Sequence, residues 1–330
     1  MGNKIFITGG SGFVGQHMIS FFIGEGYEVM ALARSEASAA KVTSKGAIAV
    51  RDDLTQLSIP TQEALESCDY VVHSAAYMDF NYEKEKFYQI NVDASKHLLE
   101  LAREAGIKKF IYISAAPVVA GSPVINLSEE EAGDDLPKAL YPKTKAIAEK
   151  SVLAANEPGF QTFSLRPPAI WGPDNHHLDE MLDLVKKGSW VWIDGSHQIL
   201  STIHVYNLSA ATLAAIENGE KGGTAYFVTD GDRRSMRTSF EAIFKAHGVE
   251  AGDREIPLGL AAGLASFFDF LWKTLRIKSR PPIPPLLIRL MAREFSVSDS
   301  KARKELQYQN VISFEEGIRS LVTSRIQAKP

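Results

Sequence analysis

The stretch Lys4-Ile-Phe-Ile-Thr-Gly-Gly-Ser-Gly-Phe-Val-Gly15 opens the chain with a short apolar run that ends at Thr8. Glycines follow at a spacing of three, at Gly9, Gly12 and Gly15, and an apolar helical pattern begins next. A strand that turns on glycines into a helix points backbone N–H groups and the positive helix end at one place, which suits a pyrophosphate. The position between a strand and a helix favours this interpretation over an ordinary turn with spare glycines.

The composition is that of a globular protein of about two domains. The chain has 330 residues, of which 45% are hydrophobic and 23% charged, and its net charge of −4 gives no indication of a nucleic-acid partner. Cys68 is the single cysteine, so we expect no internal disulfide, and a reducing, cytoplasmic location without a secretory signal. Ligand spacings for zinc or iron–sulfur clusters are absent, and the adjacent His176 and His177 are expected to be solvated, so no metal site is predicted.

The end of the second predicted strand, Glu28 to Ala33, bears on the choice of cofactor. An acid there would accept hydrogen bonds from a ribose 2′-hydroxyl and would indicate NAD. The sequence has Ala33 and then Arg34, and a guanidinium beside a small residue suits a 2′-phosphate. We therefore predict NADP(H) as the preferred cofactor, with NAD(H) as the alternative if Arg34 is only a solvated loop residue.

Further strands are predicted at Ala47 to Val50, Tyr70 to Ala76 and Phe110 to Ala116, alternating with helices. This alternation predicts an α/β fold, a Rossmann-type doubly wound parallel sheet whose ligands lie at the carboxyl ends of the strands. Asp53 follows the third strand and is a candidate to meet the adenine amino group, although a surface turn would also explain it. Small residues, Ala75 and Ala76, end the fourth strand and leave room for a flat cofactor.

The second informative stretch is Tyr141-Pro-Lys-Thr-Lys145, at the start of a predicted helix. Tyr141 and Lys145 are one turn apart on the same helix face, and a nearby ammonium should lower the pKa of the tyrosine. The same spacing occurs at Tyr82 and Lys86 in a charged stretch, but only Tyr141 follows the fifth strand. We therefore predict Tyr141 and Lys145 as the catalytic pair.

These motifs together resemble the extended short-chain dehydrogenases/reductases, and within them the 3β-hydroxysteroid dehydrogenase-like branch. The resemblance covers nearly the whole chain, and its matching segments are Thr8-Gly-Gly-Ser-Gly-Phe-Val-Gly15, Asp53-Leu54, His73-Ser-Ala-Ala76, Asn91-Val92, Tyr141-Pro-Lys-Thr-Lys145 and Leu165-Arg-Pro-Pro-Ala-Ile-Trp-Gly-Pro173, with weaker matches from Phe295 to Leu306.

The resemblance implies roles for particular residues. Tyr141 would donate or accept the proton of the substrate oxygen, and Lys145 would hold the nicotinamide ribose while tuning Tyr141. Pro167 would lie beside that ribose, and Asn91 would brace the site rather than react. The resemblance also extends the dinucleotide site to three more residues, Phe13, Val14 and Leu54, and it makes a homodimer plausible.

One position departs from the family pattern. Ala116 stands where the family usually has a serine or threonine whose hydroxyl binds the substrate oxygen. Loss of such a donor costs about 2.7–4 kcal/mol of transition-state stabilisation in well-studied enzymes. Ser114, two residues earlier, could point to the same face of the strand. Ser122, the substrate's own hydroxyl and a water are the other candidates, and the sequence does not choose among them.

The second half of the chain is predicted to bind the substrate. Residues 1–165 are assigned to the dinucleotide-binding domain, with 197–220 returning to it, and residues 166–196 and 221–330 form a smaller C-terminal substrate-binding region. Within residues 258–295 an apolar run, Leu258 to Trp272, precedes the cations Lys273, Arg276, Lys278 and Arg280. Fifteen residues are too few to span a bilayer, so the run predicts either a helix over the substrate cleft or one in peripheral contact with a membrane.

The sequence therefore predicts an NADP(H)-dependent oxidoreductase that interconverts a ketone and a secondary alcohol on a hydrophobic, steroid-like or long-chain 3-oxo substrate. A sugar-nucleotide epimerase or dehydratase is an alternative in the same fold, for which Arg233, Arg234 and Arg237 would supply charge toward a diphosphate. A dinucleotide-binding sensor without turnover is a third reading, motivated by Ala116.

Overall fold

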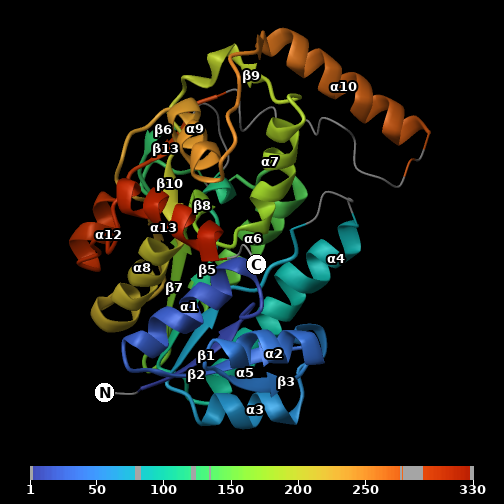
Figure 1. Cartoon of the computed structure of the whole chain (residues 1–330). Helices are drawn as coiled ribbons and strands as arrows, with labels where there is room; N and C mark the ends of the chain where they lie inside the picture. The colour runs from blue at the N-terminus through green and yellow to red at the C-terminus, as the bar shows by residue number, and fades with distance from the viewer. Residues whose placement is uncertain are drawn as a thin grey trace.

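The computed structural model describes residues 3–78, 83–119, 124–133, 135–275, 277 and 293–327. Within these residues, seven parallel strands form the central sheet in the order β11-β7-β5-β4-β1-β2-β3 (Figure 1). The strands are β1 (Lys4–Thr8), β2 (Glu28–Ala33), β3 (Ile48–Arg51), β4 (Tyr70–His73), β5 (Lys109–Ile113), β7 (Gln161–Arg166) and β11 (Thr224–Phe227). Because β1 pairs with both β2 and β4, the strand order reverses between β1 and β4, where doubly wound sheets bind their ligands. The predicted α/β fold is confirmed.

Both faces of the sheet are covered, which explains why its strands are almost continuously apolar. In β1, Ile5 and Ile7 join the core on one face and Phe6 joins the core on the other. The first face packs against α1 (Phe13–Gly24), α2 (Glu36–Ser44), α8 (Val205–Asn218) and α12 (Ser300–Glu305). The second face packs against α3 (Ile59–Glu66), α5 (Ala94–Glu104) and α6 (Leu140–Ala154).

The boundaries of helices and strands differ from the predicted ones mainly at the carboxyl ends of the strands. The fourth and fifth strands end at His73 and Ile113, and the small residues after them lie in loops, with a 3₁₀ turn at η3 (Ala116–Val118). The helix predicted to open at Asn91 instead continues from α4 (Lys84–Tyr88) through a π-helical turn, η2 (Gln89–Asp93), into α5. The other 3₁₀ turns are η1 (Leu54–Gln56), η4 (His176–Leu178) and η5 (Asp194–Ser196).

The remaining elements lie beyond the carboxyl edge of the sheet (Figure 1). They are three parallel strand pairs, β8 (Ala169–Trp171) with β10 (Thr202–His204), β9 (Trp192–Ile193) with β12 (Glu255–Ile256) and β6 (Val124–Leu127) with β13 (Phe295–Val297), and the helices α7 (Asp179–Lys186), α9 (Met236–Ala246), α10 (Leu258–Thr274) and α13 (Phe314–Gln327). Apolar side chains of β9, α7, α9, α10 and α13 form a separate core around Trp171, Trp192 and Phe244, whereas those of β6 and β13 join a smaller cluster with Ala115 and Ala116. The central sheet extends past residue 220 through β11, and the proposed division into two domains stays a prediction.

Helix α10 stands apart from the rest of the molecule, at the top of the view in Figure 1. Ala261 and Ala265 are buried in the core around Trp192 and Phe244, whereas Leu260, Phe267 and Phe270 are exposed. Of the helices in the described part of the chain, none combines the length and the apolar character needed to cross a membrane.

Candidate active site

The predicted site residues converge on one edge because each follows the carboxyl end of a parallel strand or heads a covering helix. The sheet brings together the segments that directly follow β1, β2, β3, β4, β5 and β7. These loops and the helix starts after them carry Gly9, Gly12, Phe13, Val14, Gly15, Arg34, Asp53, Leu54, Ala75, Ala76, Ala116 and Pro167. Tyr141 and Lys145 lie in the first two turns of α6, next to β5. Ser122 and Tyr82 lie outside the described residues.

The glycine-rich loop has the geometry of an anion cradle. Gly9 has φ +75°, and a Cβ there would lie 2.7 Å from the backbone nitrogen of Ala75, so only glycine allows β1 and β4 loops to approach this closely. Gly12 is exposed and precedes α1 as its N-cap, with no side-chain cap on the first helical N–H groups. A Cβ on Gly12 would meet only the Gly9 carbonyl oxygen, so free space lies in front of these donors. The loop therefore fits a dinucleotide pyrophosphate.

A buried hydrogen-bond chain ties this loop to the next strand and helix. His73 Nδ1 contacts Thr8 Oγ1 at 2.6 Å, and Nε2 contacts Ser95 Oγ at 2.8 Å. Ser95 donates its hydroxyl proton to the Asn91 carbonyl oxygen, so Nε2 of His73 must donate to Ser95 and Nδ1 must accept from Thr8. Burial lowers the pKa of His73 to about 3, and the imidazole stays neutral. Thr8 Oγ1 in turn accepts from the Ala75 backbone N–H.

Asn91 continues the chain of contacts to α6. Its Oδ1 accepts from the backbone N–H of Tyr77 at 2.6 Å, and its Nδ2 donates to the Tyr77 carbonyl at 3.0 Å and to Thr144 Oγ1 at 3.1 Å. Thr144 Oγ1 donates to the backbone carbonyls of Leu140 and Tyr141. Asn91 thus holds the loop after β4 against the start of α6, in agreement with a bracing role.

Tyr141 and Lys145 lie on the same face of α6, but the expected electrostatic effect of Lys145 on Tyr141 is wrong for this structure. Burial raises the pKa of Tyr141 to about 12 and lowers that of Lys145 to about 7. The Lys145 ammonium instead donates to the Ile113 carbonyl at 2.6 Å and lies 4.0 Å from the ring centroid of Tyr112. Tyr141 therefore carries its proton at neutral pH, as a group that protonates a carbonyl oxygen must.

Ser114 is the hydroxyl nearest in sequence to the gap at Ala116. Its Oγ is buried and has no hydrogen-bond partner among the described residues. Ser114 directly follows β5, and continued strand alternation would put it on the side of Tyr112, whose ring lies under the Lys145 ammonium. Ala116 is fully buried, and its backbone N–H donates to the Pro167 carbonyl at 2.8 Å. A buried hydroxyl without a partner is costly, and a bound polar group would relieve that cost.

The two residues predicted for the adenosine end lie next to each other. Arg34 Nε is 3.8 Å from Asp53 Oδ2, and the Arg34 side chain is 75% exposed. Asp53 uses its other oxygen to accept from the backbone and side chain of Thr55. Ser35 caps the N-terminus of α2 by accepting from the Ser38 N–H, so a helix start lies directly beside Arg34.

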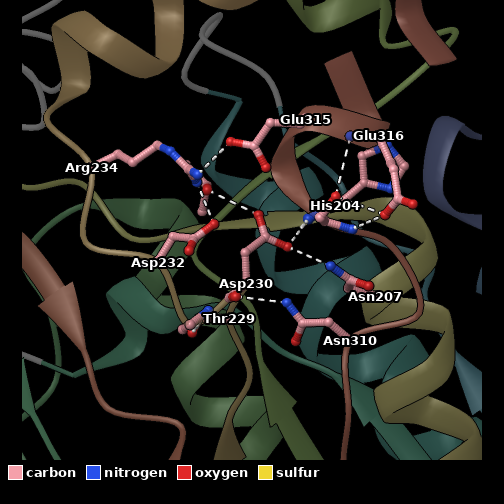
Figure 2. A network of polar contacts seen from close by, with 12 residues as sticks. His204, Asn207, Thr229, Asp230, Asp232, Arg234, Asn310, Glu315 and Glu316 are labelled. Atoms are coloured by element: carbon pink, nitrogen blue, oxygen red, sulfur yellow. Dashed lines mark hydrogen bonds and ion pairs between the residues drawn. The ribbon is translucent and has the colours of Figure 1, made fainter. Parts of the chain in front are cut away.

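A second polar network lies beyond the site and holds the C-terminal segments on the fold (Figure 2). The Asp230 carboxylate accepts hydrogen bonds from the His204 backbone, from Asn207 Nδ2 and from Trp171 Nε1. Next to it, Arg234 pairs with Asp232 and with Glu315. The three arginines proposed to meet a diphosphate are all in ion pairs, because Arg233 contacts Glu294, and Arg237 contacts Glu241 and Asp253.

The sequence did not reveal the residues beneath Lys145. Glu149 and Arg166 form a buried ion pair, and Tyr112 supplies the ring under the ammonium. A signal was present in the sequence, since Glu149 follows Lys145 by one helical turn. The partner Arg166 comes from β7, a strand that the sequence analysis did not predict.

The chain is similar to known oxidoreductases over nearly its whole length. A model described as the 3-beta hydroxysteroid dehydrogenase/isomerase family matches residues 6–258. A 4-hydroxy-2-methyl-3-oxo-4-farnesyl-3,4-dihydroquinoline-1-oxide ketoreductase of Stigmatella aurantiaca is 34% identical, with 96% of this chain and 95% of the relative covered. A decarboxylating sterol-4-alpha-carboxylate 3-dehydrogenase of Dictyostelium discoideum is 32% identical, with 96% and 99% covered.

Solved structures of other enzymes share the fold. A UDP-glucose 4-epimerase of Thermotoga maritima superimposes with a TM-score of 0.75 at 20% identity, over 99% of this chain and all of the epimerase chain (100%). Identity at this level speaks for the fold alone, whereas the family match spans most of the chain and includes the glycine-rich loop, Tyr141 and Lys145. The protein is an oxidoreductase that belongs to the 3-beta hydroxysteroid dehydrogenase/isomerase family.

Proposed function

We propose that the protein is an NADP(H)-dependent oxidoreductase that interconverts a ketone and a secondary alcohol, of the 3-keto/3β-hydroxy type, on a hydrophobic substrate. The observation that carries this proposal is the placement of Tyr141 and Lys145 on the inner face of α6, at the same sheet edge as the glycine-rich loop. The names of the two curated relatives, a ketoreductase and a 3-dehydrogenase, agree with a reaction at a ring or chain ketone.

Gly9, Gly12 and Gly15 would hold the pyrophosphate of the cofactor, and Ala75, Ala76 and Pro167 would border its nicotinamide half. When bound, the nicotinamide supplies the hydride that reduces the carbonyl carbon. Tyr141 keeps its proton at neutral pH and gives it to the carbonyl oxygen as charge develops there. In the opposite direction Tyr141 must first lose that proton, so oxidation of the alcohol is favoured at higher pH.

The preference for NADP(H) over NAD(H) rests on Arg34. Its guanidinium is largely exposed, follows β2 directly and stands beside the start of α2, which together suit a 2′-phosphate. Asp53 lies on one side of Arg34, with its Oδ2 3.8 Å from Arg34 Nε. Asp53 and Leu54 would then border the adenine.

The substrate oxygen would be bound by Tyr141 and by Ser114 in place of the hydroxyl missing at Ala116. Ser114 is buried and has no partner among the described residues, and it directly follows β5, whose Tyr112 lies against Lys145. This favours an active enzyme over a non-catalytic sensor. The ion pairs of Arg233, Arg234 and Arg237 with carboxylates weaken the sugar-nucleotide alternative, because a diphosphate would have to displace those partners.

Helix α10 is proposed to contact a membrane surface from which a hydrophobic substrate could enter. Phe267 is 58% exposed and Phe270 is 67% exposed, and they share the helix with exposed Leu260 and Leu264. The sequence places Lys273, Arg276, Lys278 and Arg280 directly after the apolar run, where anionic headgroups would attract them. The homodimer implied by the family resemblance stays a prediction.

The test is turnover with a panel of apolar 3-ketones, steroid-like and long-chain, followed by the loss of NADPH absorbance. We expect NADPH oxidation with at least one ketone, and we expect Tyr141→Phe to reduce kcat by at least about a hundredfold while NADPH still binds. Tight NADPH binding with no turnover across the panel would instead favour the sensor, and activity only on a nucleotide sugar would favour the epimerase.

A further inference from the structure

Two charged side chains, Glu149 and Arg166, lie near the buried Lys145 and have no step assigned to them in the proposed reaction. Lys145 is 1% exposed, and its ammonium is held by the Ile113 carbonyl and the face of the Tyr112 ring. One turn later on α6, Glu149 is also buried, at 3% exposure. Burial alone disfavours an ammonium, and in this structure it lowers the pKa of Lys145 to about 7.

Glu149 is fixed in place as a charged group. Arg166 Nη2 donates to Glu149 Oε1 at 2.7 Å, and Arg166 Nε contacts both carboxylate oxygens at 3.1 Å. Ser164 Oγ donates to Oε2 at 2.6 Å. A carboxylate that receives a forked guanidinium and a hydroxyl is held as an anion with a single orientation.

The same network holds three elements together around the lysine. Lys145 and Glu149 come from α6, and Arg166 comes from β7. Tyr112 comes from β5, the strand that pairs with β7 in the sheet. Arg166 also lies over the ring of Phe227 on β11, at 5.5 Å from its centroid. The Glu149 carboxylate on α6 is therefore held in position by two side chains of the sheet strand β7, Ser164 and Arg166.

We propose that Glu149 is a positioning residue that keeps Lys145 protonated, with Arg166 limiting how far it does so. The carboxylate attracts the lysine's positive charge through a water-poor interior, whereas the guanidinium opposes it. Among the described residues, the other titratable groups near Lys145 are Tyr141 on α6, Tyr112 on β5 and His73 on β4. All three are neutral at pH 7, since burial raises the pKa of both tyrosines and lowers that of the histidine.

This arrangement predicts opposite effects from the two partners of one ion pair. Glu149→Gln removes the anion and leaves two buried cations, so the pKa of Lys145 should fall by at least about one unit. Arg166→Met removes the opposing cation and leaves the carboxylate to Lys145, so the pKa should rise. The double variant removes both charges, and buried pairs often tolerate such a replacement, so its lysine should titrate between the two single variants.

The experiment uses the full-length protein labelled with ¹³C at lysine Cε. The Lys145 signal is assigned as the one missing from Lys145→Arg, and its chemical shift is titrated from pH 5 to pH 11. Glu104→Gln, an exposed residue on α5, is the charge-matched control and should leave the Lys145 titration unchanged. Circular dichroism and thermal melts select the pH range in which each variant is folded. If Glu149→Gln does not fold, the comparison of Arg166→Met and the double variant with the wild type still measures the effect of the carboxylate.

A downward shift in Glu149→Gln and an upward shift in Arg166→Met support the proposal. Shifts of the same sign, or titrations that stay within about 0.3 unit of the wild type in every folded variant, overturn it, because a purely structural ion pair would weaken folding in both variants without reversing the lysine's response. The role of this charge in turnover rests on the proposed function, but the lysine titration does not. An enzyme with no ketone substrate and the expected shifts would refute the proposed function alone.

Discussion

Gly15 lies so close to Gly9 that a Cβ on Gly15 would be 2.1 Å from the Gly9 carbonyl oxygen and 2.6 Å from the Gly10 Cα. The first turn of α1 therefore rests directly on the backbone of the glycine-rich loop. The contact is between two backbone segments, so neither partner can move a side chain to make room. This close approach fixes where the first N–H groups of the helix point.

Gly15→Ala should consequently disturb both binding and stability. We expect the affinity for NADPH, measured by fluorescence titration, to fall more than tenfold, and stability to fall by about 1–3 kcal/mol, the usual range for overpacking. Gly24→Ala is the matched control in the same helix, because a Cβ there meets no atom within 4 Å. It should leave NADPH binding unchanged and raise stability by up to about 1 kcal/mol. Normal NADPH binding by Gly15→Ala would refute the proposal that the glycine-rich loop binds the pyrophosphate of the cofactor.

Arg34→Ala should change the choice between cofactors. Loss of a guanidinium that pairs with a 2′-phosphate should weaken NADPH binding at least tenfold and leave NADH binding within about twofold. Arg103→Ala, an exposed arginine on α5, should change neither affinity. An unaltered ratio of the two dissociation constants in Arg34→Ala would mean that Arg34 does not select the cofactor.

Ser114→Ala tests the substitute for the missing hydroxyl. Because Ser114 Oγ is buried and has no partner among the described residues, its removal should not lower the melting temperature and should tend to raise it. If the hydroxyl binds the substrate oxygen, kcat should fall about 100- to 1,000-fold, as for other single oxyanion donors. Ala116→Ser is the converse test, because it adds a hydroxyl at position 116. We expect kcat to rise if the lack of a hydrogen-bond donor at this position limits the rate. Full activity in Ser114→Ala would exclude Ser114 from the reaction.

The neutral state of His73 predicts how stability depends on pH. Its pKa is about 3 in the folded protein and about 6.5 in an unfolded chain. Between these values the unfolded chain binds a proton that the folded one does not, so the free energy of unfolding falls as pH drops below 6.5, by about 1.4 kcal/mol per unit. Urea unfolding of the wild type at pH 7 and pH 5 should show this loss. The loss should be smaller in His73→Gln and unchanged in His97→Gln, whose exposed histidine lies on α5.

The exposed face of α10 predicts binding to anionic vesicles. Burial of two phenylalanine side chains contributes about 3–6 kcal/mol when complete, so replacing Phe267 and Phe270 by serine should weaken sedimentation with phosphatidylglycerol-containing vesicles by about a hundredfold. Ile59→Ser, at an exposed isoleucine of α3, is the control for lost surface hydrophobicity. Wild-type protein that ignores such vesicles, or a double variant that binds them equally well, would contradict the proposed contact.

Much of the fold could be predicted from the sequence because local patterns determine it. The glycine spacing identified the turn into α1, and runs of apolar residues identified the buried strands β2, β4 and β5. β7 was missed because its sequence, Gln161 to Arg166, mixes polar residues with only two large apolar side chains, and its burial comes from neighbours distant in the chain.

The electrostatics of the site could not be predicted in the same way. Tyr141 and Lys145 were recognised by spacing, and a charged lysine near a tyrosine was expected to lower the tyrosine pKa. Burial outweighs that effect here, and burial depends on β5, β7 and α6 packing together. The ion pair of Glu149 with Arg166 likewise joins residues 17 positions apart on different elements. The sequence predicted the reacting groups, whereas only the structure shows the burial and the ion pair that act on their charge.

The pairing of β1 with β4 has a consequence for synthesis of the protein. The glycine-rich segment after β1 ends at Gly15, and β3 is complete at Arg51. The strand β4, which pairs with the other edge of β1, is complete only at His73. A nascent chain that has left the ribosome only as far as β3 exposes one flank of β1 as an unpaired strand edge. Such edges are prone to aberrant pairing, so a chaperone that bound the chain during translation of residues 52–70 would protect this edge of β1.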